Sequence, residues 1–232
     1  MSIFGKNFGP FVLISGLFTL PFLIVSMLAA HPITIEKVTG LAGNSLMSQA
    51  NIWPYLVPLL QSLASAAVIA GTFMQMNGQR MRTLDAFLAS LRRIGPLIGV
   101  TILEVLAVGI GLVLLIVPGF IAITMLYVSL PVCICEQRGV TESLNRSSAL
   151  TRGHRWKVLG IALVTGAISA ILGPAIRQLA FKIGGPTAYL LVEYLFQVLY
   201  IPFSAIVSVV AYQALRTAKE GPAIGTFAEV FA

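Results

Sequence analysis

Charged residues are scarce in this chain. Of its 232 residues only 10% are Asp, Glu, Lys or Arg, whereas a soluble domain carries about 25%. Eight acidic and fifteen basic side chains cannot cover the surface of a water-soluble globule of this length, and 57% of the residues are hydrophobic. So apolar a chain is not disordered. The composition predicts an integral membrane protein and argues against an ordinary soluble hydrolase or kinase.

Residues that carry metal, redox or nucleophilic chemistry are equally few. The two histidines, His31 and His154, are expected on opposite faces of the membrane, so they form no metal pair. Cys133 and Cys135 are two residues apart, which places them on different faces of a helix. Packing is the simplest role for both cysteines, with lipidation or redox chemistry as the alternative. Because the chain also lacks nucleotide-binding and nucleophile-elbow motifs, we expect no enzyme activity, no metal and no cofactor.

Long apolar segments define the predicted architecture. A helix needs about 20 largely apolar residues to cross the bilayer core, and Pro-Gly pairs such as Pro118-Gly119 mark turns between helices. Pro174 and Arg177 are taken as the end of the fifth helix. We therefore predict an all-α integral membrane fold, a single domain over residues 1–221 followed by a C-terminal tail at 222–232. Its six transmembrane helices are expected at about 11–30, 53–76, 94–117, 119–135, 158–173 and 189–212.

Positive residues are distributed unevenly between the two sets of connectors. Twelve Lys and Arg residues fall in the N-terminal segment, the second and fourth connectors and the C-terminal segment, against three in the remaining connectors. Cytoplasmic loops carry the excess of positive charge, so both termini are expected in the cytoplasm, with the chain in a bacterial inner membrane. The net charge of +7 is then explained by anionic lipid, and we expect no nucleic-acid partner.

Two of the cytoplasmic connectors have the pattern of amphipathic surface helices. Met81, Leu84, Leu88 and Leu91 form one apolar stripe at helical spacing, and a second helix is expected to begin after Gly139 with Leu144 and Leu150 facing inwards. Such helices lie in the membrane interface with basic residues towards phosphates. The predicted headgroup ligands are Arg92, Arg93, Arg146, Arg152, Arg155 and Trp156. The alternative is a pair of ordinary solvated, positively charged loops.

Small residues at four-residue spacing occur in two of the predicted helices. They are Ser62, Ala66 and Ala70 in one helix, and Ala162, Gly166 and Ala170 in the other. Such stripes let helices approach closely, so both helices are expected inside the bundle or at a subunit contact.

The second half of the chain carries a recognisable pattern. It contains Pro118-Gly119, then Leu130-Pro131-Val132, Glu136 and Gly139, followed by the run from Ser143 to Trp156, Gly160, and the closing segment from Tyr212 to Gly221. Over about residues 75–221 this pattern resembles the bacterial glycerophosphoryl diester phosphodiesterase membrane-domain family. The resemblance implies a stand-alone membrane part, because no stretch remains to form a catalytic barrel. It transfers no catalytic residue to this chain.

Two acidic residues fall inside the predicted membrane helices. Glu104 is expected near mid-bilayer, where an unpaired charge is costly. We expect it to face the bundle interior and to meet Gln61, Ser62, Ser65 or Thr165; a functional, proton-linked cavity is the alternative. Glu193 is shallower, with Arg177 or Lys182 in reach and Gln197 one turn away, which favours a structural ion pair.

Two functions remain open from the sequence. The first is a non-enzymatic interaction, assembly or envelope-maintenance factor that contacts anionic lipids and other membrane subunits. The second is a transporter or lipid-handling protein with a cavity near Glu104, supported by prolines in or near several of the predicted helices. A membrane-embedded hydrolase is disfavoured because no cluster of His, Asp and Ser is present.

Overall fold

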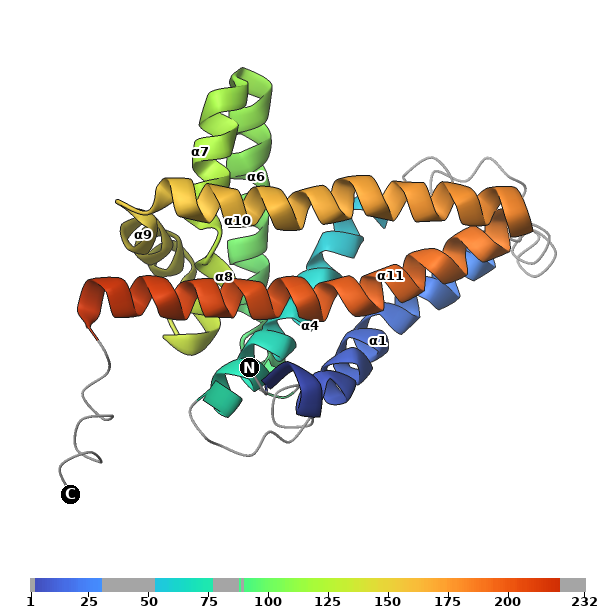
Figure 1. Cartoon of the computed structure of the whole chain (residues 1–232), viewed down its shortest axis with the longest axis horizontal. Coiled ribbons are helices and arrows are strands. Elements are labelled where there is room, and N and C mark those ends of the chain that lie inside the picture. Colours follow the sequence, from blue (N-terminus) through green and yellow to red (C-terminus); the bar gives the residue numbers. More distant parts are fainter. Residues whose placement is uncertain (1–2, 31–52, 77–87, 89, 222–232) are drawn as a thin grey trace.

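The computed structural model describes residues 3–30, 53–76, 88 and 90–221, and every regular element within these ranges is a helix. The predicted all-α class is therefore confirmed. Figure 1 shows two helical hairpins that leave a common base in different directions, with a diagonal helix beside the longer one. The elements are α1 (Ile3–Ala30), α4 (Trp53–Met76), α6 (Ile94–Leu114), α7 (Ile116–Leu126), α8 (Ser129–Cys135), α9 (Val140–Thr151), α10 (Arg155–Ala167), the π-helical turn η1 (Ile168–Leu172) and α11 (Gly173–Glu220).

The first hairpin is formed by α6 and α7, and its turn is tighter and earlier than expected. Leu115 alone connects the two helices in an extended conformation, with φ −161° and ψ 142°. The predicted boundary at Pro118-Gly119 is wrong because Pro118 lies in the first turn of α7, where a missing N–H costs no intrahelical hydrogen bond. Gly119 instead lets the two helices approach: a Cβ on Gly111 would come within 2.9 Å of the Gly119 Cα.

The predicted single helix over 119–135 is broken into α7 and α8 at Tyr127 and Val128. Pro131 is the physical cause, because its ring nitrogen cannot donate to the carbonyl of Tyr127. The Val128 carbonyl still accepts from the Val132 amide at 3.0 Å, so α8 starts directly after the break. One carbonyl in the disturbed turn, that of Met125, accepts a hydrogen bond from the Ser147 hydroxyl at 2.6 Å.

The second hairpin is one long apolar helix folded back on itself. Its first arm runs through α10, η1 and the start of α11, and its turn is at Gly184 and Gly185, where Gly185 has φ 67° and ψ −158°. The predicted helix end near Gly173 is therefore wrong. Pro174 removes one α-helical hydrogen bond, but η1 directly precedes it, and the chain continues as a helix through this wider turn.

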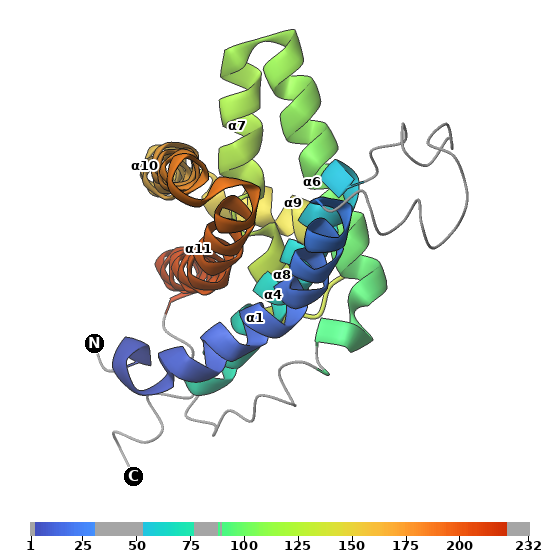
Figure 2. The same cartoon turned by 90° about the vertical axis from the view of Figure 1, so that its right-hand side faces the viewer.

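The core is formed where α1, α4 and the second arm of α11 pack together (Figure 2). Phe11, Ile14, Ala66 and Val209 are buried there, and the hydroxyl of Ser15 donates to the carbonyl of Val198 at 2.8 Å. The small residues of α4 are thus packed inside the protein, as expected. The stripe in the other helix is not packed in the same way, because a Cβ on Gly166 would meet no atom within 4 Å.

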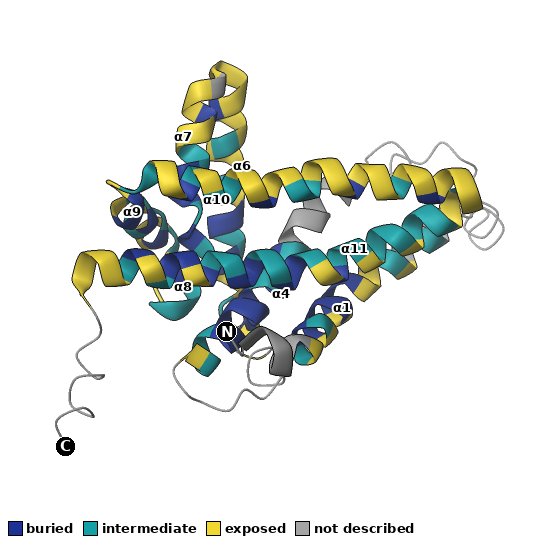
Figure 3. Cartoon of the chain, viewed as in Figure 1, coloured by how far each residue is buried: buried dark blue, intermediate teal, exposed yellow. Residues whose placement is uncertain are grey.

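Three segments of the described chain are long and apolar enough to cross a membrane, instead of the six expected. They are Ile94–Leu114, Val117–Cys135 and Arg155–Glu220, the last of which is 66 residues long and contains both the predicted 158–173 and 189–212 helices. In α1 only Gly9–Pro21 is found as a shorter apolar helix. Figure 3 shows that the first hairpin and the first arm of the second are exposed along much of their length, whereas buried residues gather in α4, α8, α9 and the second arm of α11.

Candidate functional site

The two hairpins meet at α8 and α9, which together with the connector between them we call the base. Several charged and polar side chains interact there. Helix α9 lies at this base and packs against α6, α7, α8 and α11. One face of α9 is buried and carries Ser143, Ser147, Leu150 and Thr151. The predicted inward position of Leu150 is therefore observed, and the buried face also carries three hydroxyl groups that bond to backbone carbonyls. Helix α9 is thus held by protein contacts along its inner side.

A carboxylate shared by three donors lies beside α9. Glu136 accepts hydrogen bonds from Arg138 Nε at 2.6 Å, from Arg146 Nε at 3.1 Å and from the Tyr212 hydroxyl at 3.0 Å. Burial by itself raises the pKa of Glu136, but these three hydrogen bonds and the charge of Arg146 outweigh it, and the pKa lies below its usual value of 4.5. Glu136 is therefore ionised at neutral pH and joins three separate segments of the chain.

The same arrangement continues to the end of α11. Arg146 also pairs with Glu220, Glu220 accepts from Arg216 Nε at 3.1 Å, and Lys219 donates to the carbonyl of Ala149. We use the name Glu136 cluster for Glu136, Arg138, Arg146, Tyr212, Arg216 and Glu220. The cluster connects the end of α8, the middle of α9 and the end of α11, so it fixes the end of the second hairpin to α8 and α9.

Arg93, one of the predicted headgroup ligands, also donates to the protein. Its Nη1 lies 2.7 Å from the carbonyl oxygen of Gln137, and its Nη2 lies 3.3 Å from the Gln137 side-chain oxygen. Gln137 has φ 53°, a left-handed conformation that turns the chain between α8 and α9. Arg93 and Arg146 are therefore engaged with the protein, each at one side of the same connector.

The remaining predicted headgroup ligands lie on the outside of the base. Arg92 and Arg152 are exposed, Arg155 is half-buried, and Trp156 has 86% of its surface exposed. His154 Nδ1 and Arg155 Nε are buried without a hydrogen-bond partner in the described part of the chain. The other predicted amphipathic helix is described only in part. Its residues 81–87 lie outside the described residues, and its Leu88 and Leu91 are exposed.

Glu104 meets a different partner from those expected. Its Oε2 accepts a hydrogen bond from the Ser129 hydroxyl at 3.1 Å, and Ser129 is fully buried at the start of α8. The expected partners Gln61, Ser62, Ser65 and Thr165 were chosen by depth in the membrane, on the assumption of straight helices. The break between α7 and α8 places Ser129 beside α6 instead, and the hydroxyl of Thr165 bonds to carbonyls in its own helix.

Glu193 is paired across the second hairpin. Its Oε2 lies 2.6 Å from Arg177 Nη1, and its Oε1 accepts from Gln197 at 2.8 Å. Both partners were expected from the sequence. The Arg177 guanidinium also lies 5.9 Å from the ring centre of Phe196. This ion pair joins the two arms of the hairpin below the turn at Gly184 and Gly185.

Sequence reasoning did not assign a role to Glu136, Tyr212 or Glu220, although all three occur in the segments that carry the family resemblance. A usable signal was present: Glu136 directly follows the expected helix end at 135, and Glu220 lies in the segment after the expected end at 212, close to arginines such as Arg138 and Arg216. Within the described residues no group of three His, Cys, Asp or Glu side chains could hold a metal ion. Compared with protein-family models, with curated proteins and with solved structures, the chain has no match in any of the three.

Proposed function

We propose that this chain is a multi-pass protein of the bacterial inner membrane, without catalytic activity, that contacts anionic lipid through its base. Both termini face the cytoplasm in this proposal. The resemblance of residues 75–221 to the glycerophosphoryl diester phosphodiesterase membrane-domain family is one of the grounds for this proposal. The protein serves interaction, assembly or envelope maintenance, and its partners are lipids and other membrane subunits.

The observation that carries the proposal is the contrast between apolar hairpins and a charged base. Val113 near the tip of the first hairpin is 87% exposed, and Ile183 at the tip of the second is 80% exposed. Apolar surface of this extent is stable in hydrocarbon and not in water. At the base, Arg92, Arg152 and Trp156 are all exposed, and basic residues with tryptophan are suited to the headgroup level of a membrane.

Lipid retention tests the headgroup contact. Each arginine near an anionic surface contributes about 1 kcal/mol, so Arg92→Gln, Arg152→Gln and Arg155→Gln together should lower the amount of phosphatidylglycerol that stays on the purified protein in native mass spectrometry. The variant with Lys at the same three positions keeps the positive charges and is the matched control, which should retain the lipid. Equal retention by the triple Gln variant and the unmodified chain would contradict the proposal.

Site-directed labelling tests the orientation. Ala149 on α9 and Thr187 beside the hairpin turn are both exposed, so a cysteine at either position is accessible from one side of the membrane. We expect a membrane-impermeant thiol reagent to label Thr187→Cys in intact cells and Ala149→Cys only after permeabilisation. The unmodified chain reports the background from Cys133 and Cys135. The reverse pattern would show that the proposed orientation is wrong.

A second candidate function is that of a transporter or lipid-handling protein. The observation that favours it is the pair of Glu104 and Ser129, a carboxyl group and a hydroxyl that meet between two segments apolar enough to cross the membrane. If this pair serves transport, Glu104→Gln should abolish lipid transfer while the fold is retained. If it is structural, the same variant should leave function and fold unchanged.

A further inference from the structure

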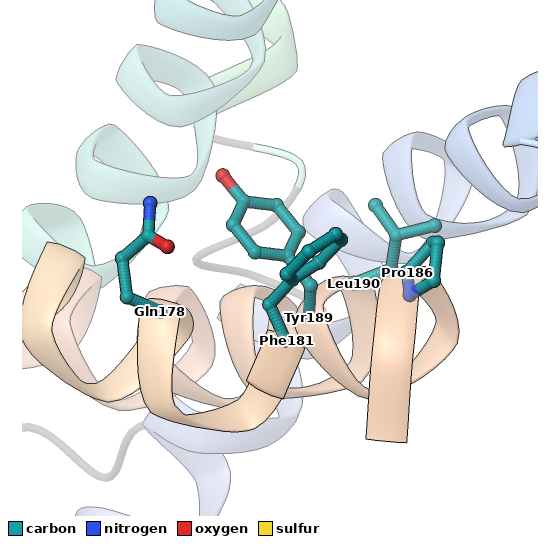
Figure 4. Close-up of a pocket in the computed structure, with 5 residues that line it drawn as sticks. All are labelled: Gln178, Phe181, Pro186, Tyr189 and Leu190. Carbon is teal, nitrogen blue, oxygen red and sulfur yellow. The ribbon is translucent and has the colours of Figure 1, made fainter. Parts of the chain in front are cut away.

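A pocket lies between the two arms of the second hairpin, next to its turn. It has a volume of about 310 Å³ and is lined by Gln178, Phe181, Pro186, Tyr189 and Leu190. The rings of Phe181 and Tyr189 meet edge to face, with their centres 6.5 Å apart. Figure 4 shows the Gln178 amide and the Tyr189 hydroxyl pointing to the same side of the pocket, while Pro186 and Leu190 form its apolar end.

The position of the pocket in the chain restricts its occupant. Arg155–Glu220 is apolar enough to cross a membrane, and the pocket residues flank the turn at Gly184 and Gly185 where this segment reverses. The pocket is therefore at the far end of a membrane hairpin, at the level where hydrocarbon gives way to headgroups. Aromatic residues with a polar tip, such as Tyr189, are enriched at that level.

The chemistry of the lining narrows the ligand further. Gln178 and Tyr189 supply neutral hydrogen-bond donors, whereas Phe181, Pro186 and Leu190 supply apolar surface. Arg177, which precedes Gln178, forms an ion pair with Glu193 at 2.6 Å, so the two charges neutralise each other. Lys182, which follows Phe181, is exposed and is not among the lining residues. Ester carbonyls next to acyl chains are the lipid groups that such a lining matches.

We propose that this pocket binds one glycerophospholipid at the level of its ester groups, with the ester carbonyls accepting from Gln178 and Tyr189 and an acyl chain lying over Pro186 and Leu190. The site is at the end of the molecule opposite the arginine-rich base, so it is separate from the headgroup contacts above. The inference rests on the proposed membrane insertion and adds a specific lipid site to it.

Native mass spectrometry of the purified full chain with added dioleoyl phosphatidylglycerol tests this site. The double variant Gln178→Leu, Tyr189→Phe removes both donors and keeps the shape of the pocket. Because the double variant loses two neutral hydrogen bonds, we expect the affinity for one lipid to weaken roughly thirtyfold. Gln213→Leu, the same exchange near the other end of α11, is the control and should leave occupancy unchanged. Unchanged occupancy in the double variant would overturn the proposal.

Further measurements distinguish a failure of this lipid site from a failure of the proposed membrane insertion. A phosphatidylglycerol with a photoactivatable acyl chain should cross-link residues 178–190 of the unmodified chain, and cross-links confined to other segments would overturn the site whether or not the variants fold. Competition by glycerophosphoglycerol, which has no acyl chains, would show that the headgroup alone is bound, and would also overturn it. If instead alkaline carbonate releases the chain from membranes, the membrane insertion itself fails.

Discussion

The hydroxyl of Tyr212 lies 3.0 Å from Oε1 of Glu136, a contact between the last third of α11 and the connector that follows α8. Tyr212 is fully buried, and the carboxylate it meets is also bound by Arg146. The second hairpin is attached to the base through this contact and through the pair of Arg146 with Glu220. The contact suggests a first test of how the base is held together.

Tyr212→Phe should destabilise the protein. The exchange removes one hydrogen bond to a charged acceptor, which contributes about 1.5–3 kcal/mol, while the ring and its packing remain. We expect a lower melting temperature in detergent by differential scanning fluorimetry. Tyr189→Phe, which changes a half-buried tyrosine of the same helix outside the Glu136 cluster, is the control. Equal melting temperatures for Tyr212→Phe and the unmodified chain would show that the hydroxyl contributes nothing.

The Glu136 cluster should make stability depend on pH in the acid range. The pKa of Glu136 is lower in the folded protein than its usual value of 4.5, so its stabilising effect is present above that value and is lost as the pH falls through the lower folded pKa. We expect the melting temperature of the unmodified chain to fall below about pH 4.5 more steeply than that of Glu136→Gln. Parallel curves for the two proteins would contradict this assignment.

Replacing Gly119 by a larger residue should destabilise the first hairpin. A Cβ at this position would lie 2.9 Å from the backbone nitrogen of Leu112, and backbone cannot move aside as a flexible side chain can. Gly119→Ala should therefore cost about 1–3 kcal/mol through overpacking. Gly109→Ala is the matched control, because a Cβ there meets nothing within 4 Å and alanine favours the helix. Thermal unfolding should separate the two variants, and a stable Gly119→Ala would show that the hairpin turn is looser than described.

Glu104 in the first hairpin and Ser129 at the start of α8 allow a test of one buried hydrogen bond. Glu104→Gln keeps an acceptor for the Ser129 hydroxyl and should change stability little. Glu104→Leu removes that acceptor and leaves the fully buried hydroxyl without it, which costs about 1–3 kcal/mol. If Ser129→Ala in the Glu104→Leu background restores none of the lost stability, the hydrogen bond is not the cause.

The ion pair between Arg177 and Glu193 should hold the arms of the second hairpin together. Either Arg177→Gln or Glu193→Gln leaves a half-buried charge without its partner, at a cost of about 1–3 kcal/mol. A double-mutant cycle measures the coupling, because the double variant should lose less stability than the sum of the single variants. Additive losses would mean that the two side chains act independently.

Helix ends could be predicted where neighbouring residues in the sequence mark them, and could not be predicted where packing against distant residues decides them. The bounds of α4 at Trp53–Met76 agree with the predicted 53–76, because the polar residues that precede it, such as Asn44, Ser45 and Asn51, are a local signal in the sequence. The turns near Pro118 and Pro174 could not be placed this way. A proline can begin a helix or follow a π-helical turn as well as end a helix, and packing decides which.

The site shows the same limit. The pair of Glu193 with Arg177 could be predicted because the two residues flank one turn. The contact of Glu104 with Ser129 could not, since it depends on where α7 breaks. The shared role of Glu136 required knowledge that positions 76 residues apart, Glu136 and Tyr212, come together.

The two arms of the second hairpin are held differently, because α1 and α4 pack against the second arm whereas the first arm beyond α10 is mostly exposed. The first arm extends from Arg155 to the turn at Gly184, about 40 Å at 1.5 Å of rise per residue. The hydrocarbon core of a bilayer is about 30 Å thick and is therefore shorter than this arm, so an arm that spans it is expected to tilt.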